Sequence, residues 1–381
     1  MNDVLKIKNI TVVNHDGRQL ADVLMENGKI VKIAPSIEED VRELDGTGRY
    51  LVPGFIDMHI HGSARMDAMD ADAAGLRILA QSLLKEGTTS FLPTTMTQSY
   101  EHIEAALQTI GTFTSQHDEA EIVGIHVEGP FVSKDRAGAQ PLEYIVEPDL
   151  VAFEKWQKLS NGKIKEITLA PERPGGMEAT KAISESGVVV SIGHSDASFE
   201  QMEQAVKMGA KQGTHLYNQM RPFHHRDPGV VGGTLLLNEL KAEIIVDFIH
   251  VHKDAVNLAY RMKGASGIIL ITDAMRAKGM PYGDYDLGGQ MVHVTETGAH
   301  LPNGALAGSV LRMNEAIVNM QKATNCTLEE LVSMSSYNAA MQLNLANKGE
   351  LREGKDADAV MLDASFQLVT TIKAGEIVFE A

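Results

Sequence analysis

Cysteine is almost absent from this sequence, since Cys326 is the only one among 381 residues. A single cysteine excludes an intramolecular disulfide, and such sparing use is typical of proteins in a reducing compartment. Residues 1–8 have neither the long apolar core of a secretion signal nor its cleavage site. No apolar run reaches the length of a transmembrane helix. We therefore expect a cytoplasmic protein with no membrane partner.

Basic residues are also few. The sequence has 34 Lys and Arg against 51 Asp and Glu, which gives a net charge of −17. This balance argues against nucleic acids and anionic membranes as partners, because both repel an acidic surface. An anionic substrate would need a local cationic pocket. The hydrophobic fraction of 44% is ordinary for a globular protein.

Both ends of the chain have the pattern of β-strands. Residues 1–52 contain short runs in which apolar and polar residues alternate, and Asn27-Gly28 between two of these runs is a strong hairpin signal. Residues 346–381 return to strand patterning after a helical region. We therefore expect residues 1–52 and 346–381 to pair into one small β domain, with residues 53–345 as a larger domain.

The middle of the chain alternates apolar strands with amphipathic helices, which predicts βα units around a parallel sheet. Helical spacing is clear at residues 76–84, 199–209 and 252–263, and two further helical stretches follow at 313–323 and 328–345. The strand candidates are residues 54–61, 88–95, 122–131, 164–170, 188–193, 213–217, 242–249 and 267–272. Eight such strands predict a (β/α)₈ barrel, whose chemistry lies at the C-terminal strand ends.

Histidines and acidic residues follow these strands where a barrel has its active site. His59 and His61 are two apart in an apolar run, so their side chains point to the same face. Other strand ends carry Glu128, His194 and His215. Each residue alone is as well explained by a buried, hydrogen-bonded side chain, but the set together favours a metal site. Imidazole and carboxylate ligands suit Zn²⁺, Fe²⁺ or Mn²⁺ rather than Ca²⁺ or Mg²⁺, and a bridging carboxylate fits two ions that activate water.

Three further residues have two interpretations each. Asp273, after a buried strand, is either a structural partner of nearby groups or the acceptor of a proton from activated water, and the metal set favours the second. Arg226, in the loop 224–229, is either solvated or a bidentate clamp for a phosphate or carboxylate. His126 lies deeper in its strand than the metal set, so we expect it in the core or beside the ligands.

Seven motifs carry a resemblance to a known family. They are residues 53–61 (PGFIDMHIH), 124–131 (GIHVEGPF), 193–197 (GHSDA), 214–218 (THLYN), 224–229 (HHRDPG), 271–275 (ITDAM) and 306–309 (LAGS). With them the sequence resembles the amidohydrolase superfamily and, within it, the N-acetylglucosamine-6-phosphate deacetylase family. The resemblance implies an α/β fold, a TIM-like metal-dependent hydrolase barrel beside a small β-sandwich domain built from both chain ends.

The resemblance also implies the metal ligands and the reaction. The implied ligands are His59 and His61 for one divalent ion, His194 and His215 for a second, and Glu128 for both. One or two ions per subunit are expected, and the presence of both strand-one histidines favours two. Asp273 would then be the proton shuttle in hydrolysis of N-acetylglucosamine 6-phosphate to glucosamine 6-phosphate and acetate.

Substrate contacts are implied in the same way. Arg226 and His250 would lie near polar groups of the phosphorylated amino sugar. Main-chain contacts are implied for Ala139, Gln140, Asn218, Gln219, Leu306, Ala307 and Gly308. In this family the phosphate-binding arginine can come from a neighbouring subunit, which implies a homodimer. Gln140 stands where many relatives have a histidine, and glutamine can hydrogen-bond the substrate but cannot act as an acid.

Two alternative functions stay open at this point. The chain could be another amidohydrolase, such as a deaminase or a cyclic-amide hydrolase, which a panel of substrates would distinguish. It could also be a catalytically silent barrel that serves as a binding scaffold, which metal analysis with a turnover assay would distinguish.

Overall fold

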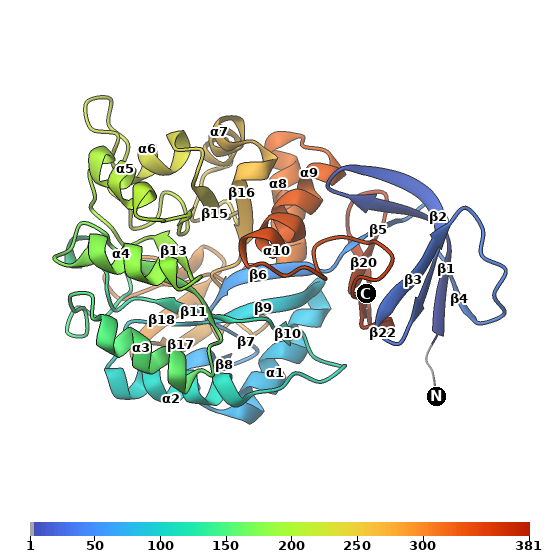
Figure 1. Cartoon of the computed structure of the whole chain (residues 1–381), viewed down its shortest axis with the longest axis horizontal. Helices are drawn as coiled ribbons and strands as arrows, with labels where there is room; N and C mark the ends of the chain where they lie inside the picture. Colours follow the sequence, from blue (N-terminus) through green and yellow to red (C-terminus); the bar gives the residue numbers. More distant parts are fainter. Residues whose placement is uncertain (1–3) are drawn as a thin grey trace.

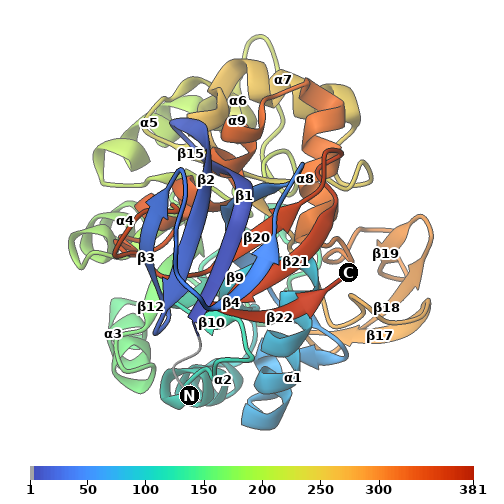
Figure 2. The same cartoon turned by 90° about the vertical axis from the view of Figure 1, so that its right-hand side faces the viewer.

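The computed structural model describes residues 4–381, and in it the two chain ends form one sheet. Its strands are β1 (Val4–Asn14), β2 (Gly17–Glu26), β3 (Lys29–Ala34), β4 (Arg42–Asp45), β5 (Tyr50–Pro53), β20 (Ala359–Leu362), β21 (Leu368–Lys373) and β22 (Glu376–Glu380). They follow the order β22-β21-β20-β5-β1-β2-β3, with β4 paired to β1. Figure 1 shows this sheet at the right of the molecule, and Figure 2 turns it toward the viewer.

Apolar residues from both chain ends enclose a common core in this sheet. Ile7, Val12 and Met25 pack in one buried cluster with Met361 and Ile372. The small β-sandwich predicted from both chain ends is thereby confirmed. Its strands are joined into one continuous sheet because β5 pairs with both β1 and β20.

The hairpin predicted at Asn27-Gly28 connects β2 and β3. The two residues have φ angles of 51° and 75°, and Glu26 pairs with Lys29 across them. Two consecutive residues at positive φ are what a type I′ turn requires, and the twist of that turn matches the twist of the flanking strands. The local sequence therefore sets the register of this hairpin.

The eight predicted central strands form a parallel barrel, which confirms the (β/α)₈ fold. They are β6 (Phe55–Ile60), β9 (Thr88–Thr95), β11 (Ile125–Glu128), β12 (Ile164–Leu169), β13 (Val189–Ile192), β14 (Gln212–Gly213), β15 (Lys241–Ile245) and β16 (Ile268–Ile271). The short β10 (Glu121–Ile122) pairs with β9. The first and last strands meet through a parallel bridge between Ile60 and Ala274.

Strand β14 is shorter than the predicted range 213–217. It ends at Gly213 because the φ angles of His215 and Tyr217, 34° and 79°, lie outside the extended region. The chain turns directly after the strand, and this turn determines the direction of the His215 side chain.

Helices alternate with the barrel strands and cover the outside of the barrel (Figure 1). They are α1 (Ala73–Leu83), α2 (Tyr100–Thr112), α3 (Leu150–Leu159), α4 (Gly176–Glu185), α5 (Phe199–Lys207), α6 (Gly229–Leu236), α7 (Lys253–Lys263), α8 (Met313–Thr324), α9 (Leu328–Val332) and α10 (Asn338–Gln342). A π-helical turn, η5 (Ser333–Tyr337), joins α9 to α10, so the predicted helix 328–345 is interrupted in its geometry. Local signals start several helices; Ser198 and Gln201, for example, form a capping box before α5.

A three-stranded antiparallel sheet between β16 and α8 was not predicted from the sequence. It consists of β17 (Gly283–Leu287), β18 (Gln290–Thr295) and β19 (Gly298–His300), and we call it the β-flap. Gly288 and Gly289 form its first turn with φ angles of 60° and 84°. Figure 2 shows the β-flap projecting from the barrel at the right. Two shorter strands, β7 (Gly62–Ser63) and β8 (Met66–Asp67), form a separate hairpin.

The element bounds suggest where the two domains divide. Strand β5 ends at Pro53 and α10 ends at Gln342. We propose boundaries after residues 52 and 345. Among residues 4–381, none of the helices combines the length and apolar character that spanning a bilayer requires.

A buried ion-pair network joins the barrel to the terminal sheet. Asp358, 7% exposed, accepts hydrogen bonds from Lys348 Nζ at 2.8 Å and Lys373 Nζ at 3.0 Å. Lys348 also pairs with Glu121 of β10 at 2.8 Å. These lysines offset the desolvated charge of Asp358 and hold its pKa below the usual value against the opposing effect of burial.

Substitution of Asp358 tests this network. We expect Asp358→Asn to lower the free energy of unfolding by about 3 kcal/mol, because buried ammonium groups lose their counter-charge. Denaturant titration followed by circular dichroism measures the change. Glu380→Gln, at the exposed end of β22, is the matched control, and equal stability of the two variants would contradict the assigned role.

Candidate active site

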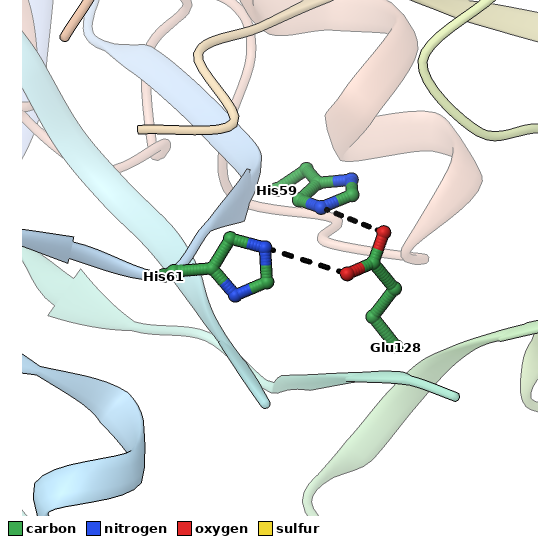
Figure 3. Close-up of side chains that lie close together, drawn as sticks. All are labelled: His59, His61 and Glu128. Atoms are coloured by element: carbon green, nitrogen blue, oxygen red, sulfur yellow. Dashed lines mark ion pairs between the residues drawn. The ribbon is translucent and has the colours of Figure 1, made fainter. Parts of the chain in front are cut away.

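Two predicted ligands, His59 and His61, lie at the C-terminal end of β6 and point to the same side. Both are buried, and their Nε2 atoms lie 3.5 Å and 3.4 Å from the two carboxylate oxygens of Glu128. Figure 3 shows the two imidazole rings facing the carboxylate. The strand alternation therefore produces the same-face arrangement that the sequence predicted.

Glu128, the last residue of β11, also contacts the other two predicted ligands. Its Oε1 lies 3.2 Å from His194 Nε2 and 3.1 Å from His215 Nε2. The residues form two sets of potential ligand atoms that share this carboxylate: His59, His61 and Glu128, and Glu128, His194 and His215. Glu128 is thus the common centre of four imidazole rings.

The backbone at three of these positions adopts a conformation that non-glycine residues seldom use. His194, His215 and Asp273 have φ angles of 47°, 34° and 48°. A residue in the left-handed region costs on the order of 1–3 kcal/mol, and such residues cluster at functional sites. Each of the three follows a barrel strand, so the sharp turn directs its side chain across the mouth of the barrel.

Hydrogen bonds behind the imidazole rings determine which nitrogen carries the proton. Three rings contact an acceptor through Nδ1: His59 with Glu243 Oε2 at 3.1 Å, His61 with Thr94 O at 3.2 Å and His194 with Arg136 O at 2.8 Å. A carbonyl or carboxylate oxygen accepts only, so Nδ1 donates, and in the neutral ring that can bind a metal Nε2 keeps a lone pair. These lone pairs converge on Glu128.

This arrangement fits a divalent cation. The Nε2 atoms of His194 and His215 lie 3.2 Å apart, and His59 Nε2 is buried without a hydrogen-bond partner in the described residues. Lone pairs that face one another and a carboxylate repel unless a positive charge lies between them. Imidazole Nε2 atoms whose Nδ1–H groups are held from behind are typical metal ligands. The residues present therefore fit the metal that the sequence predicted.

The charges of the site favour a positive ion. Burial lowers the pKa of His59, but the negative charges of Asp273 and Glu128 outweigh burial and raise it to about 9. Burial raises the pKa of Glu128, but the surrounding imidazoles, beginning with His59, hold it well below its usual value. The two carboxylates thus create a negative potential at the position where the Nε2 lone pairs meet.

Asp273 lies directly beside this cluster. Its Oδ1 is 3.5 Å from His59 Nε2 and 3.3 Å from His61 Nε2, and its backbone N–H donates to His59 O at 2.8 Å. Burial opposes ionisation, but the positive charge of His59 in its protonated form and a hydrogen bond from protonated His61 lower the pKa of Asp273 to about 2. Asp273 is therefore ionised at neutral pH.

A pocket with about 470 Å³ of open space lies over this cluster. Its lining includes most of the predicted residues: His61, Glu128, Ala139, Gln140, His194, His215, Asn218, Gln219, His250, Asp273, Leu306 and Gly308. His250 donates Nδ1–H to Asp247 Oδ2 at 2.6 Å, which leaves its Nε2 available to the pocket. Met96, directly after β9, and Leu287 of the β-flap also line the pocket, and the sequence did not identify them.

Two residues predicted to contact the substrate, Ala307 and Gln140, have hydrogen-bond partners within the chain. Ala307 is buried outside the pocket lining, and its N–H donates to Ala299 O at 3.0 Å, so its predicted main-chain contact with substrate stays a prediction. Gln140 uses its side-chain amide to donate to Glu128 Oε2 at 2.7 Å and to accept from Thr97 N at 2.9 Å. Gln140 therefore supports Glu128 through its side chain.

Arg226 is exposed on the loop after β14 and does not line the pocket of its own chain. Its Nη1 contacts His225 Nε2 at 2.8 Å.

His59 and His126 do not line the pocket and are fully buried beneath it. Burial lowers the pKa of His126 to about 3. The core position predicted for His126 agrees with its full burial and its hydrogen bond to Thr168 Oγ1 at 2.8 Å.

Sequence comparisons with known proteins agree with the geometry of this site. A profile of the amidohydrolase family matches residues 50–378. The chain belongs to this family. It is 66% identical over 376 residues to an N-acetylglucosamine-6-phosphate deacetylase of Lysinibacillus sphaericus, with 98% of this chain and 97% of that protein covered. It is 45% identical to the Bacillus subtilis protein of the same name, with 86% and 84% covered.

Solved structures agree with these relatives. An N-acetylglucosamine-6-phosphate deacetylase from Thermotoga maritima has a TM-score of 0.89 at 35% identity, covering 99% of this chain and 100% of that chain. A Mycobacterium smegmatis variant in complex with N-acetyl-D-glucosamine-6-phosphate has a TM-score of 0.91 at 27% identity, with 99% of each chain covered. The resemblance inferred from the seven motifs is confirmed, and amidohydrolases of this family are metal-dependent.

Loss of Glu128 tests the metal site. Glu128→Ala removes the carboxylate that contacts all four histidines, so we expect metal content to fall by at least about tenfold. Elemental analysis after dialysis against Zn²⁺ measures this. Glu143→Ala, an exposed carboxylate near Gln140, is the control. A Glu128→Ala protein with the metal content of the control would contradict this site.

Proposed function

We propose that this protein hydrolyses the acetamide of N-acetylglucosamine 6-phosphate to glucosamine 6-phosphate and acetate. The observation that carries the proposal is the position of Asp273, whose Oδ1 lies 3.3 Å from His61 Nε2 at the floor of the pocket, beside the imidazoles around Glu128. Relatives at 66% and 45% identity carry the name of this activity. These comparisons favour it over a deaminase, a cyclic-amide hydrolase or a silent scaffold.

The proposed metal site holds two divalent ions, of Zn²⁺, Fe²⁺ or Mn²⁺. His59 and His61 would hold one ion, His194 and His215 would hold the other, and Glu128 would serve both sets. Such ions polarise a carbonyl oxygen and lower the pKa of water. Gln140 holds Glu128 in place, and the Nδ1–H contacts hold His59, His61 and His194, so these side chains need little rearrangement when the substrate enters.

Asp273 moves the proton in this proposal. As an ionised carboxylate it accepts a proton from the attacking water while oxygen bonds to the acetyl carbon. It then donates that proton to the amino-sugar nitrogen as the C–N bond breaks, so that acetate and the amine leave. The carboxylate returns to its ionised form for the next turnover.

The phosphate is proposed to be bound across a homodimer. Within residues 4–381 no carboxylate forms an ion pair with Arg226, and this arginine lies outside the pocket lining of its own chain. An exposed guanidinium beside His224 and His225 is a cationic feature on a chain of net charge −17. It suits a phosphate held in the neighbouring subunit's pocket. His250, which lines the pocket of the same chain, is proposed to contact the sugar.

A cytoplasmic location stays a prediction.

Asp273→Asn tests the proton shuttle. The amide keeps the shape of the side chain but cannot accept the proton, so we expect acetate release to fall by about 10²- to 10⁴-fold. Metal content should stay within about twofold of wild type, because Asp273 is not an essential ligand in this proposal. Asp286→Asn on the exposed edge of the β-flap is the control. Activity within tenfold of wild type would rule out this role.

Arg226→Ala tests the phosphate contact. We expect KM for the phosphorylated sugar to rise about 10- to 100-fold, since a charge-assisted contact is lost, with little change for unphosphorylated N-acetylglucosamine. Arg261→Ala, an exposed arginine on α7, is the control.

If Arg226 acts across a dimer, mixing Arg226→Ala and Asp273→Asn chains should restore about a quarter of wild-type activity, because half the dimers gain one intact site. Absence of this complementation would contradict the contact across the dimer: Arg226 would then act in the site of its own chain or in neither site.

A further inference from the structure

A buried carboxylate that the proposed reaction does not use lies beneath the metal site. Glu243, on β15, is 0% exposed. Its Oε2 accepts from His59 Nδ1 at 3.1 Å and from the backbone N–H of His215 at 3.2 Å. His59 and His215 belong to the two different ligand sets. One oxygen atom therefore contacts both halves of the site, but it contacts only His59 through the ring.

The other carboxylate oxygen and the backbone carbonyl of Glu243 also accept hydrogen bonds inside the barrel. Gln212 Nε2 donates to Glu243 Oε1 at 2.7 Å and also to Glu166. The backbone carbonyl of Glu243 accepts from Leu216 N at 2.8 Å. Both carboxylate oxygens thus have donors, which come from Gln212 on the neighbouring strand β14, from His215 directly after it and from His59 on β6. A carboxylate held in this way can determine the orientation of a ring that donates to it.

We propose that Glu243 is a positioning residue for one of the two ions, through its hydrogen bond to His59. The carboxylate only accepts, so His59 carries its proton on Nδ1 and presents the lone pair of Nε2. That Nε2 atom is buried, has no hydrogen-bond partner in the described residues and lies 3.5 Å from Glu128 Oε1. The inference rests on the proposed two-ion site.

The geometry predicts unequal effects on the two ion positions. Glu243 contacts His215 only through the main chain, so it does not set the ring orientation of that ligand. His194 receives its support from the Arg136 carbonyl instead. Loss of the Glu243 charge should therefore weaken the ion held by His59 and His61 and leave the other largely unchanged.

Glu243→Gln tests the proposal, with Glu166→Gln as the matched control. Both side chains are 0% exposed and both contact Gln212, but within residues 4–381 Glu166 forms no hydrogen bond to a proposed ligand. Zn²⁺ affinity is measured by competition with a chromophoric chelator. We expect Glu243→Gln to weaken one Zn²⁺ position by about 10- to 100-fold, and Glu166→Gln to leave both within about threefold.

A double-mutant cycle assigns the weakened position. In a His59→Asn background, Glu243→Gln should cause no further loss of Zn²⁺ affinity, whereas in a His194→Asn background it should weaken the remaining ion by the same factor as in wild type. If Glu243→Gln does not fold by circular dichroism, Glu243→Asp replaces it. Aspartate keeps the charge but withdraws it from His59 by one methylene, so we expect a smaller loss in the same direction.

Three results would overturn the proposal: wild-type affinity in a folded Glu243 variant, an equal loss in Glu166→Gln, or a further loss in the His59→Asn background. A wild-type chain that binds only one Zn²⁺ would contradict the two-ion site itself. Two ions in wild type with no effect of Glu243→Gln would contradict only the role of Glu243.

Discussion

The structure depends on hydrogen bonds that hold the metal-site imidazoles from behind. His59, His61 and His194 each donate Nδ1–H to an acceptor of the barrel scaffold, and this leaves three Nε2 lone pairs directed at Glu128. Free rings would exchange tautomers and rotamers, and ordering them would cost binding energy. The scaffold bears that cost during folding, so the site is prepared before an ion or a substrate arrives.

The barrel explains how residues far apart in sequence reach one carboxylate. Parallel strands end at one rim, and the left-handed backbone at His194, His215 and Asp273 directs the side chains inward there. The hydrogen bond from Asp273 N to His59 O closes the barrel and also fixes the proposed proton acceptor beside the first ligand. The β-flap then covers one side of the pocket with Leu287. Contacts that close the barrel therefore also bring the residues of the site together.

Local patterns predicted the barrel and its rim well, because strand alternation and strand ends are properties of short segments. The same reasoning placed His59, Glu128 and Asp273 together. It missed the β-flap, although Gly288-Gly289 between alternating residues was a usable hairpin signal. It also missed Glu243, whose charge within a predicted buried strand pointed to a specific partner. The contact of Gln140 with Glu128 could not be predicted, because it depends on packing between segments that short sequence patterns do not describe.

In the proposed metal site, the Nε2 atoms of four histidines and the carboxylate of Glu128 bind two divalent ions. Anomalous diffraction from crystals grown with Zn²⁺, recorded on both sides of the zinc edge, tests it most directly. We predict two anomalous peaks about 3.5–4 Å apart, each about 2.0–2.2 Å from two imidazole Nε2 atoms and from a Glu128 oxygen. Peaks elsewhere, or coordination through Nδ1, would contradict this two-ion site.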